Sequence, residues 1–268
     1  MKGKEKLLRR LEEISQAAQK TGKVRALLGF GSVAQVERMD AYSDLDFLVI
    51  AKKGYKWELI EDLGWMTSIA PVGYFYLFTS DGYRLFFKDG IFCDFGIVEE
   101  EEAKTIPHGE GRVIWCEDDF DQWICRSTAQ GNGGEIDLER AVGETLTNLY
   151  IGLCRFARGE KLAAARCIQN LALDHLLACS HLINKETVYY KDPFQNERRY
   201  EKRFPSLARS LPKMIQGYEK SPESALAILE FMESTFEINP YMKELIKNLA
   251  NDLIHKRSGS IVNHPFMA

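Results

Sequence analysis

VRALLGFGSVAQVERMDAYSDLDFLVI, residues 24–50, is the segment from which the expected fold follows. Two short apolar runs in it, 24–28 and 47–50, have the branched side chains of buried strands, and the second strand is expected over 44–50. After the first run the chain turns through glycines, and the spacing from Ser32 to Gln35 is that of a capping box. We therefore expect two neighbouring strands, connected by a glycine turn and a short helix that begins at Ser32.

Two aspartates, Asp44 and Asp46, stand at the head of the second apolar run. Residues two apart in a strand project to the same face, so both carboxylates are expected to point one way. Anions held this close repel each other unless a cation lies between them. Mg²⁺ suits such a pair, since it binds one or two carboxylates and completes its shell with water and phosphate. Taken alone, however, the pair is better explained as a solvated strand end.

The glycine turn changes that balance. Gly29 and Gly31 allow backbone amides to approach phosphate oxygens closely. Ser32 can donate its hydroxyl, and the helix start attracts anions. A simpler explanation is that the glycines serve only the turn and Ser32 only caps the helix. The turn and the aspartate pair together are more specific, because two neighbouring strands would place phosphate-binding and metal-binding groups side by side.

A third carboxylate, Asp94, lies in the apolar segment IFCDFGIV. A charge with apolar neighbours on both sides is costly to bury without a partner, and a metal shared with Asp44 and Asp46 would supply that partner. The alternative is an edge-strand aspartate that faces water.

The remaining pattern indicates an α+β chain, with strands in its first part and helices in its second. Asp81-Gly82 and Asp89-Gly90 are signals of two-residue hairpin turns. A glycine cluster at 129–137 suggests a linker, which divides the chain into domains 1–132 and 133–268. Further strands are expected at 72–79, 83–88, 91–98 and 112–116. Helices are expected at 3–20, 54–70, 136–158, 161–183, 204–218, 221–235 and 239–256.

The composition excludes several classes of protein. Apolar residues make up 45% and charged residues 28% of the 268 residues, as in a globular chain with a real core. Without a membrane-length apolar stretch or a secretory leader, we expect a cytoplasmic protein with no membrane partner. The six cysteines form no CxxC pair and are expected to be reduced. A net charge of −4 argues against a nucleic-acid partner and favours a small molecule.

The chain resembles the nucleotidyltransferase superfamily that includes DNA polymerase β. The matching residues are Gly31-Ser32, Asp44-x-Asp46 and Asp94. The same region also resembles bacterial antibiotic nucleotidyltransferases, which act on aminoglycosides and lincosamides. The motif match covers residues 24–98, and beyond it the likeness is one of layout, a helical domain after a nucleotidyltransferase domain.

The resemblance implies a fold, namely a mixed β-sheet with flanking helices followed by an all-α helical bundle. It also implies a function and a set of site residues. Asp44 and Asp46 would bind Mg²⁺ and the nucleotide, and Gly31 and Ser32 would bind the phosphates of an NTP, with ATP as the expected donor. Asp94 would bind a second Mg²⁺ or act as the base. The reaction would transfer a nucleoside monophosphate to a hydroxyl of a small molecule, such as an aminoglycoside or lincosamide, and so confer antibiotic resistance.

Other interpretations stay open at this point. One is AMP transfer to a protein, as in antitoxin-like nucleotidyltransferases, and another is a nucleotide-binding module without turnover. Glu144 is a candidate additional base, and the charged cluster 197–203 a candidate contact to the triphosphate or substrate. The broad apolar face of 161–183 suits either a bundle core or a homodimer interface.

Overall fold

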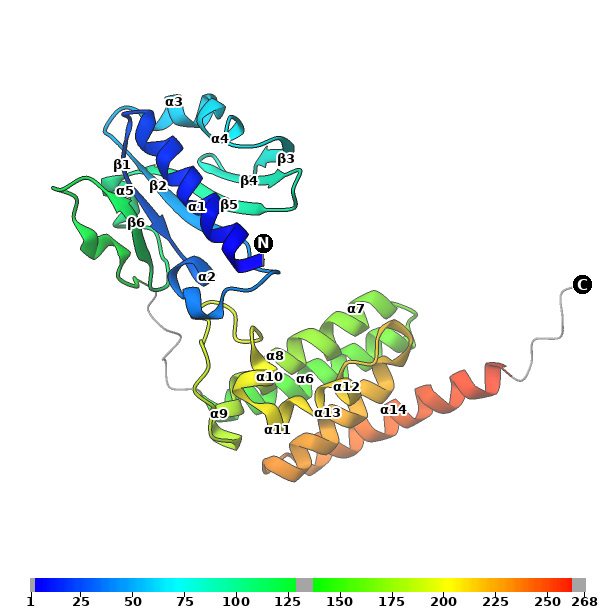
Figure 1. Ribbon diagram of the computed structural model, residues 1–268. Coiled ribbons are helices and arrows are strands. Elements are labelled where there is room, and N and C mark those ends of the chain that lie inside the picture. Colours follow the sequence, from blue (N-terminus) through cyan, green and yellow to red (C-terminus); the bar gives the residue numbers. More distant parts are fainter. Residues whose placement is uncertain (1–2, 129–136, 262–268) are drawn as a thin grey trace, which may run out of the picture. The chain divides into compact units, whose positions relative to one another are not determined.

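The computed structural model describes residues 3–128 and 137–261 (Figure 1). The chain divides into two compact units, Met1–Gln130 and Gly131–Ala268, each with its own hydrophobic core. The boundary expected between residues 132 and 133 lies outside the described residues. Within the described ranges, no helix has both the length and the apolar character needed to cross a membrane.

A six-stranded mixed sheet forms the centre of the first unit, in the order β3-β4-β5-β2-β1-β6. Strands β2 and β5 pair in parallel, and the other neighbouring pairs are antiparallel. The β3–β4–β5 meander and the pairing of the first two strands were both expected from the sequence. The strands span Val24–Gly29 (β1), Leu45–Ala51 (β2), Val72–Leu77 (β3), Gly82–Phe87 (β4), Phe92–Glu99 (β5) and Arg112–Cys116 (β6).

One face of the sheet is covered by helices and forms the main core of this unit (Figure 1). Every second residue of the central strands points into it, because side chains alternate between the two faces of a strand. Burying each large apolar side chain contributes about 1.5–3 kcal/mol. The buried residues at the start of β2 and β5 are Leu45, Phe47, Cys93 and Phe95. The covering helices are α1 (Gly3–Lys20), α3 (Lys56–Glu61) and α4 (Gly64–Thr67).

The opposite face is covered at one end. There Ile50 and Val98, late in β2 and β5, belong to a second cluster with Phe120 and Ile124. The elements beside this cluster are α5 (Glu100–Ala103) and the 3₁₀ helix η2 (Gln122–Cys125). At the other end, where β2 and β5 begin, the same face carries half-buried polar residues. The uncovered end of this face is therefore where polar side chains can meet a ligand.

The described part of the second unit contains helices and connecting loops but no strands. Its core is formed mainly by α6 (Leu138–Ala157), α13 (Ser221–Thr235), α14 (Pro240–Ile261) and the segment from Lys161 to Ile183. That segment is broken into α7 (Lys161–Arg166), the π-helix η3 (Cys167–Ala172), α8 (Leu173–Ala178) and α9 (Ser180–Ile183). Shorter helices are α10 (Tyr200–Arg203), α11 (Pro205–Ala208), α12 (Leu211–Met214) and the 3₁₀ turn η4 (Tyr218–Lys220). The expected fold class, a mixed sheet with flanking helices followed by a helical bundle, is confirmed.

The expectations for two helices of the first unit are corrected. The helix expected over 54–70 is two short helices, because the Asp62 carboxylate accepts a hydrogen bond from the amide of Gly64 (2.7 Å) and ends the first. The helix expected to begin at Ser32 is α2 (Gly31–Ala34), with Phe30 at the N-cap position. Ser32 is therefore not its cap. A 3₁₀ turn, η1 (Val36–Arg38), follows α2.

Candidate active site

The parallel pairing of β2 and β5 places Asp46 and Asp94 side by side. The two residues are direct partners across the strands, so their side chains share one face of the sheet. Both are half-buried, whereas the residues before and after them in each strand are buried on the core face. Asp94 lies on a central strand, and the alternative of an edge-strand aspartate is excluded. Two carboxylates in this position need positive charge nearby.

The glycine turn lies directly against this carboxylate pair. Gly31 has φ of +54°, and a Cβ added to it would lie 2.9 Å from Oδ2 of Asp46. Only glycine can adopt this positive φ and leave room for the Asp46 carboxylate without strain. The amide of Phe30 donates to the carbonyl of Asp46 (2.9 Å), which holds the end of β1 against the start of β2. The turn therefore brings main chain, rather than a side chain, next to the Asp46 carboxylate.

Ser32 is buried and ties the turn to the segment before β2. Its hydroxyl donates to the backbone carbonyl of Asp44 over 3.4 Å, a long hydrogen bond. The amides of Val33 and Ala34 donate to the carbonyl of Phe30 within the turn. Because the amides of Val33 and Ala34 already donate to Phe30, a phosphate at this turn would be bound through Gly31 and Ser32.

Asp44 precedes β2 instead of forming its first residue, as the strand begins at Leu45. Among the residues that the structure describes, no group of three or more His, Cys, Asp or Glu side chains is placed to hold a metal ion. The convergence of Asp44, Asp46 and Asp94 on one metal position, which the sequence suggested, is thus not present. The donor set that does fit a divalent cation is the Asp46–Asp94 pair, whose oxygens are hard ligands at neighbouring positions.

Arg84, which was not among the residues expected from the sequence, contacts Asp94 of the pair. Arg84 of β4 is the cross-strand partner of Asp94, and its Nε donates to Oδ2 of Asp94 at 3.0 Å. Its Nη1 donates to the hydroxyl of Tyr76 on β3 (3.2 Å). The hydrogen bonds to Tyr76 and then Asp94 raise the pKa of Arg84 above its usual value. Tyr76, Arg84, Asp94 and Asp46 thus form one row across four adjacent strands.

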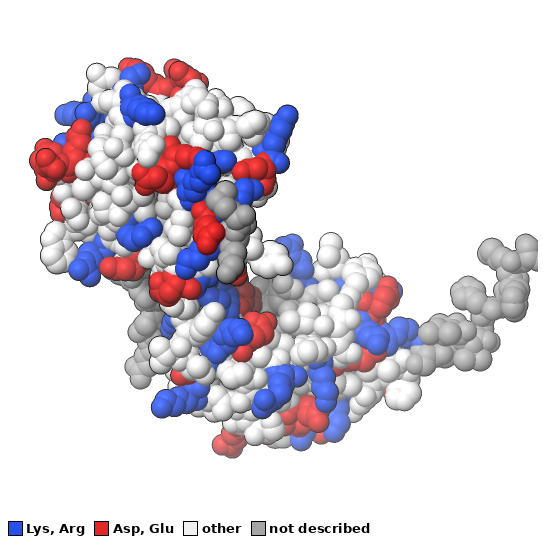
Figure 2. All heavy atoms as spheres, viewed as in Figure 1, with Lys and Arg blue, Asp and Glu red and all other residues white. Residues whose placement is uncertain are grey.

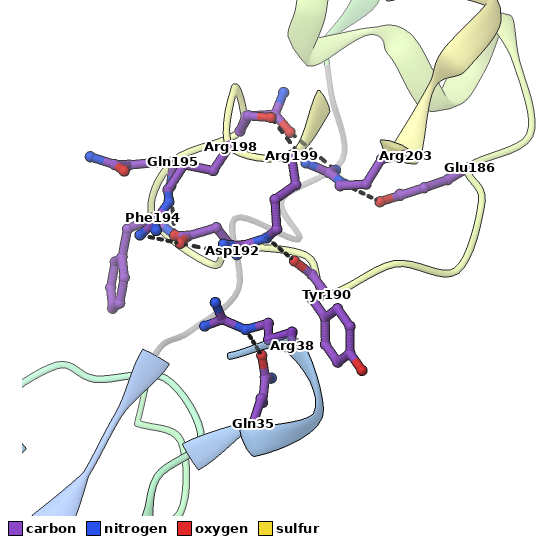
Figure 3. Close-up of polar contacts among 11 residues, drawn as sticks. Gln35, Arg38, Glu186, Tyr190, Asp192, Phe194, Gln195, Arg198, Arg199 and Arg203 are labelled. Carbon is purple, nitrogen blue, oxygen red and sulfur yellow. Dashed lines mark hydrogen bonds and ion pairs between the residues drawn. The ribbon is translucent and has the colours of Figure 1, made fainter. Parts of the chain in front are cut away.

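A second arginine lies beside the glycine turn. Arg38 of η1 donates through Nε to Oε1 of Gln35 (2.6 Å, Figure 3). A Cβ added to Gly31 would lie 3.6 Å from Nη2 of Arg38, so the guanidinium is next to the same turn as Asp46. Positive charge therefore flanks the carboxylate pair from both η1 and β4.

The arginines of cluster 197–203 hold their own loop together. Arg203 is buried and donates to Glu186 (2.6 Å), and Arg199 donates to the carbonyl of Tyr190 (2.6 Å). Arg198 and Arg199 also pair with Asp192 at 3.2 and 3.3 Å (Figure 3). These contacts stabilise the loop before α10, which accounts for the arginines of the cluster. Glu144, the other candidate in this unit, is half-buried on α6.

Surface charge agrees with the composition. On the visible face in Figure 2, Lys and Arg are interspersed with Asp and Glu over the described residues. This mixture matches a chain with net charge −4 and shows no broad basic field on that face for a nucleic-acid backbone.

No protein-family model matches the chain, and no curated protein matches it in sequence. Similar solved structures are nucleotidyltransferases or nucleotidyltransferase-like. An aminoglycoside 6-adenyltransferase from Bacillus subtilis is 12% identical, over 94% of this chain and 97% of that one, with a TM-score of 0.31. A STING-associated c-di-GMP synthase from Capnocytophaga granulosa is 13% identical, over 96% and 81%, with a TM-score of 0.29.

A third similar structure is a nucleotidyltransferase-like protein from Exiguobacterium sibiricum. It is 12% identical, over 91% of this chain and 76% of that one, with a TM-score of 0.25. TM-scores below 0.5 do not establish a shared arrangement of whole chains. The case for the site therefore depends on the strands and side chains of the first unit.

Proposed function

We propose that the protein is a Mg²⁺-dependent nucleotidyltransferase that transfers a nucleoside monophosphate from an NTP, with ATP as donor, to a hydroxyl of a small molecule. The observation that carries the proposal is the Asp46–Asp94 pair on adjacent parallel strands, with the backbone of Gly31 against Asp46. This arrangement joins hard metal ligands to a turn suited to phosphate. By the resemblance, an aminoglycoside or a lincosamide is the acceptor class to test first.

Each site residue has a proposed role in the reaction. Asp46 and Asp94 are the proposed ligands for Mg²⁺, and Asp44, which precedes β2, is not assigned to the metal. Gly31 and Ser32 are the proposed contacts for the β- and γ-phosphates. Bound Mg²⁺ would neutralise the triphosphate and stabilise both the attacking and the leaving oxygen.

In the transfer, the acceptor oxygen forms a bond to the α-phosphorus while the bond from that phosphorus to the leaving pyrophosphate breaks. Asp94 is the proposed acceptor of the hydroxyl proton, because it lies next to Asp46 on the side away from Gly31. Its contact with Arg84 uses Oδ2, so Oδ1 is the atom assigned to this role. Arg84 would keep the carboxylate in a fixed orientation.

The two units have different proposed roles. Domain 1–132 carries the proposed catalytic residues, and no residue of the helical domain 133–268 is assigned to the site. Because the arginines of the loop before α10 are engaged in fastening that loop, we do not assign them to the triphosphate.

The test is a turnover assay with the purified full chain. NTPs, Mg²⁺ and a panel of aminoglycosides and lincosamides are incubated together, and pyrophosphate release is followed. Asp46→Asn and Asp94→Asn should each lower turnover at least about 100-fold, since even residues that only support metal ligands typically cost 10–100-fold. Asp118→Asn is the matched control, because that aspartate is exposed in the turn after β6 and should leave turnover unchanged.

Three outcomes would contradict the proposal in different ways. If nucleotide and Mg²⁺ raise the melting temperature but no turnover is detected, the protein is a nucleotide-binding module. AMP incorporated into a protein, with no small molecule modified, would indicate the antitoxin-like activity. If the melting temperature is unchanged at millimolar ATP and Mg²⁺, both enzyme hypotheses are excluded. A ligand at 100 times its Kd stabilises the folded protein by about 2.7 kcal/mol, which would be visible.

A further inference from the structure

The face that carries Asp46 and Asp94 continues toward the sheet edge as a surface of exposed rings. We call this surface the aromatic face; it consists of Tyr74, Tyr76, Phe78, Phe86 and Phe92. The strand register places Tyr74 opposite Phe86 and Phe86 opposite Phe92, on the same side as Asp94. Tyr74 is 59% exposed and Phe86 39%. Grouped apolar exposure of this kind marks a binding surface more often than scattered single residues do.

The rings are in contact with one another. Phe86 and Phe92 stack with centroids 4.4 Å apart and planes 15° from parallel. Tyr74 lies 6.2 Å from Phe86 and 5.6 Å from Tyr76. The surface is thus continuous from β5, beside the carboxylate pair, to the edge strand β3.

The aromatic face and the carboxylate pair are joined by one guanidinium. Arg84 bonds Asp94 and Tyr76, and it also lies 4.5 Å from the centre of the Phe78 ring. Arg84 is the charged residue that β3 and β4 contribute to this face, since their other residues on it are Tyr74, Tyr76, Gly82 and Phe86. Those two strands therefore offer no carboxylate to an acceptor's ammonium groups.

If the proposed function holds, the geometry of the displacement places the acceptor at the aromatic face. An in-line displacement requires the attacking hydroxyl and the leaving pyrophosphate on opposite sides of the α-phosphorus. Across the sheet the order is the Gly31 turn after β1, Asp46 on β2, Asp94 on β5, and then the rings of β4 and β3. With the leaving phosphates at Gly31, the hydroxyl approaches from the side of the aromatic face.

We propose that the aromatic face is the acceptor-binding surface, and that the acceptor is a hydroxylated small molecule presenting an apolar ring face. Such a molecule is an aryl glycoside or a sugar whose C–H face stacks on the rings, as opposed to a polycation. This inference rests on the proposed nucleotidyl transfer. It narrows the acceptor class, because a polycation would meet Arg84 and no opposing carboxylate on β3 and β4.

The test uses two full-chain variants and a matched control. Tyr74→Thr and Phe86→Thr remove exposed rings from the face and keep a residue that favours strands. Phe75→Thr removes a ring that is 47% exposed on the same strand but points to the opposite side of the sheet. Three readouts are taken: kcat and KM for acceptors, the melting-temperature shift with ATP and Mg²⁺, and binding of 4-nitrophenyl glucoside by ligand-observed NMR.

The expected result is an acceptor KM raised by about tenfold, and 4-nitrophenyl glucoside binding weakened by about tenfold, in each ring variant, because each variant loses one stacking contact. The shift with ATP and Mg²⁺ should be unchanged, and Phe75→Thr should match the natural chain in all readouts. Lincosamides and aryl glycosides should be better acceptors than polycationic aminoglycosides.

Each other result is decisive. If turnover occurs and the ring variants match Phe75→Thr, the aromatic face is not the acceptor site, although the transferase function stands. If the variants reduce the shift with ATP instead, the rings bind the nucleobase and the inference is wrong. If they change the oligomeric state by light scattering and leave acceptor KM unaltered, the face is a subunit contact. If aryl glycoside binding depends on the rings without any turnover, the surface is supported and the proposed function fails.

Discussion

The helix-covered face of the sheet buries Leu45, Phe47 and Phe95 almost completely, whereas the opposite face of the same strands carries Asp46 and Asp94 half-exposed. The two sets alternate along β2 and β5, one residue apart. Because side chains alternate in a strand, one pair of strands supplies both the core and the polar site. We therefore expect substitutions on the core face to lower stability and substitutions on the polar face to lower the proposed activity, even at neighbouring residues.

The largest effect on stability is expected on the core face. Phe95→Ala should lower the free energy of unfolding by about 3–5 kcal/mol, because it leaves a cavity in a packed core. Phe95 stacks on Phe47 at 4.9 Å and meets Trp65 edge-on at 6.1 Å. Asp94→Asn, one residue away, should change the free energy of unfolding by less than about 1 kcal/mol, as its partner Arg84 is well exposed.

Urea unfolding followed by tryptophan fluorescence measures this contrast. All four tryptophans, including Trp65, lie in the first unit, so the signal reports that unit. Equal losses for Phe95→Ala and Asp94→Asn would show that the two faces are not separable.

An intermediate effect is expected at the glycine turn. Gly31→Ala should cost about 1–2 kcal/mol of stability for the left-handed backbone alone, and it should also reduce the response to ATP and Mg²⁺, because the new Cβ would press on Asp46. Gly54→Ala is the control, since Gly54 has φ of +86° with no atom within 4 Å of its added Cβ.

The control variant isolates backbone strain from the close approach to the carboxylate. Unfolding and the melting-temperature shift with ATP and Mg²⁺ are compared for the two variants. If Gly54→Ala weakens the nucleotide response as much as Gly31→Ala does, contact with Asp46 is not the reason for glycine at the turn.

The smallest effect on stability is expected at Arg84. Arg84→Gln should cost under about 1 kcal/mol, because the ion pair with Asp94 is partly exposed. Turnover should nevertheless fall about 10–100-fold, the usual cost of losing a group that orients a metal ligand. Arg112→Gln, at an exposed arginine of β6, is the control. Higher turnover in Arg84→Gln would mean that the guanidinium competes with the metal for Asp94.

The strands and the general place of the candidate site were predictable from the sequence, but the register of the β4–β5 hairpin was not. A two-residue turn at Asp89-Gly90 would pair Arg84 with Phe95. The connection is instead three residues long, with Gly90 at φ of +90° and its amide bonded to the carbonyl of Phe87. This shift of one residue places Arg84 opposite Asp94 and on the polar face.

Other features depend on tertiary contacts that local patterns do not contain. The π-helix at Cys167–Ala172 interrupts a segment whose apolar period reads as one helix. Arg203 appears in the sequence as one charge in a polar cluster, yet it is buried against Glu186 because the loop before α10 folds over it. In both cases the sequence indicates the residue type, and the packing of the second unit decides its role.

The parallel pairing of β2 with β5 also sets the order in which the site can form during synthesis. Antiparallel neighbours such as β1 and β2 can pair soon after both leave the ribosome, but a parallel partner requires a long crossover. Here the crossover contains α3, α4, β3 and β4, and it separates Asp46 from Asp94 by 48 positions. A nascent chain that ends before β5 can hold a glycine turn and Asp46, but it has no partner carboxylate. The proposed activity is therefore absent from every shorter intermediate and appears only when this long-range contact closes.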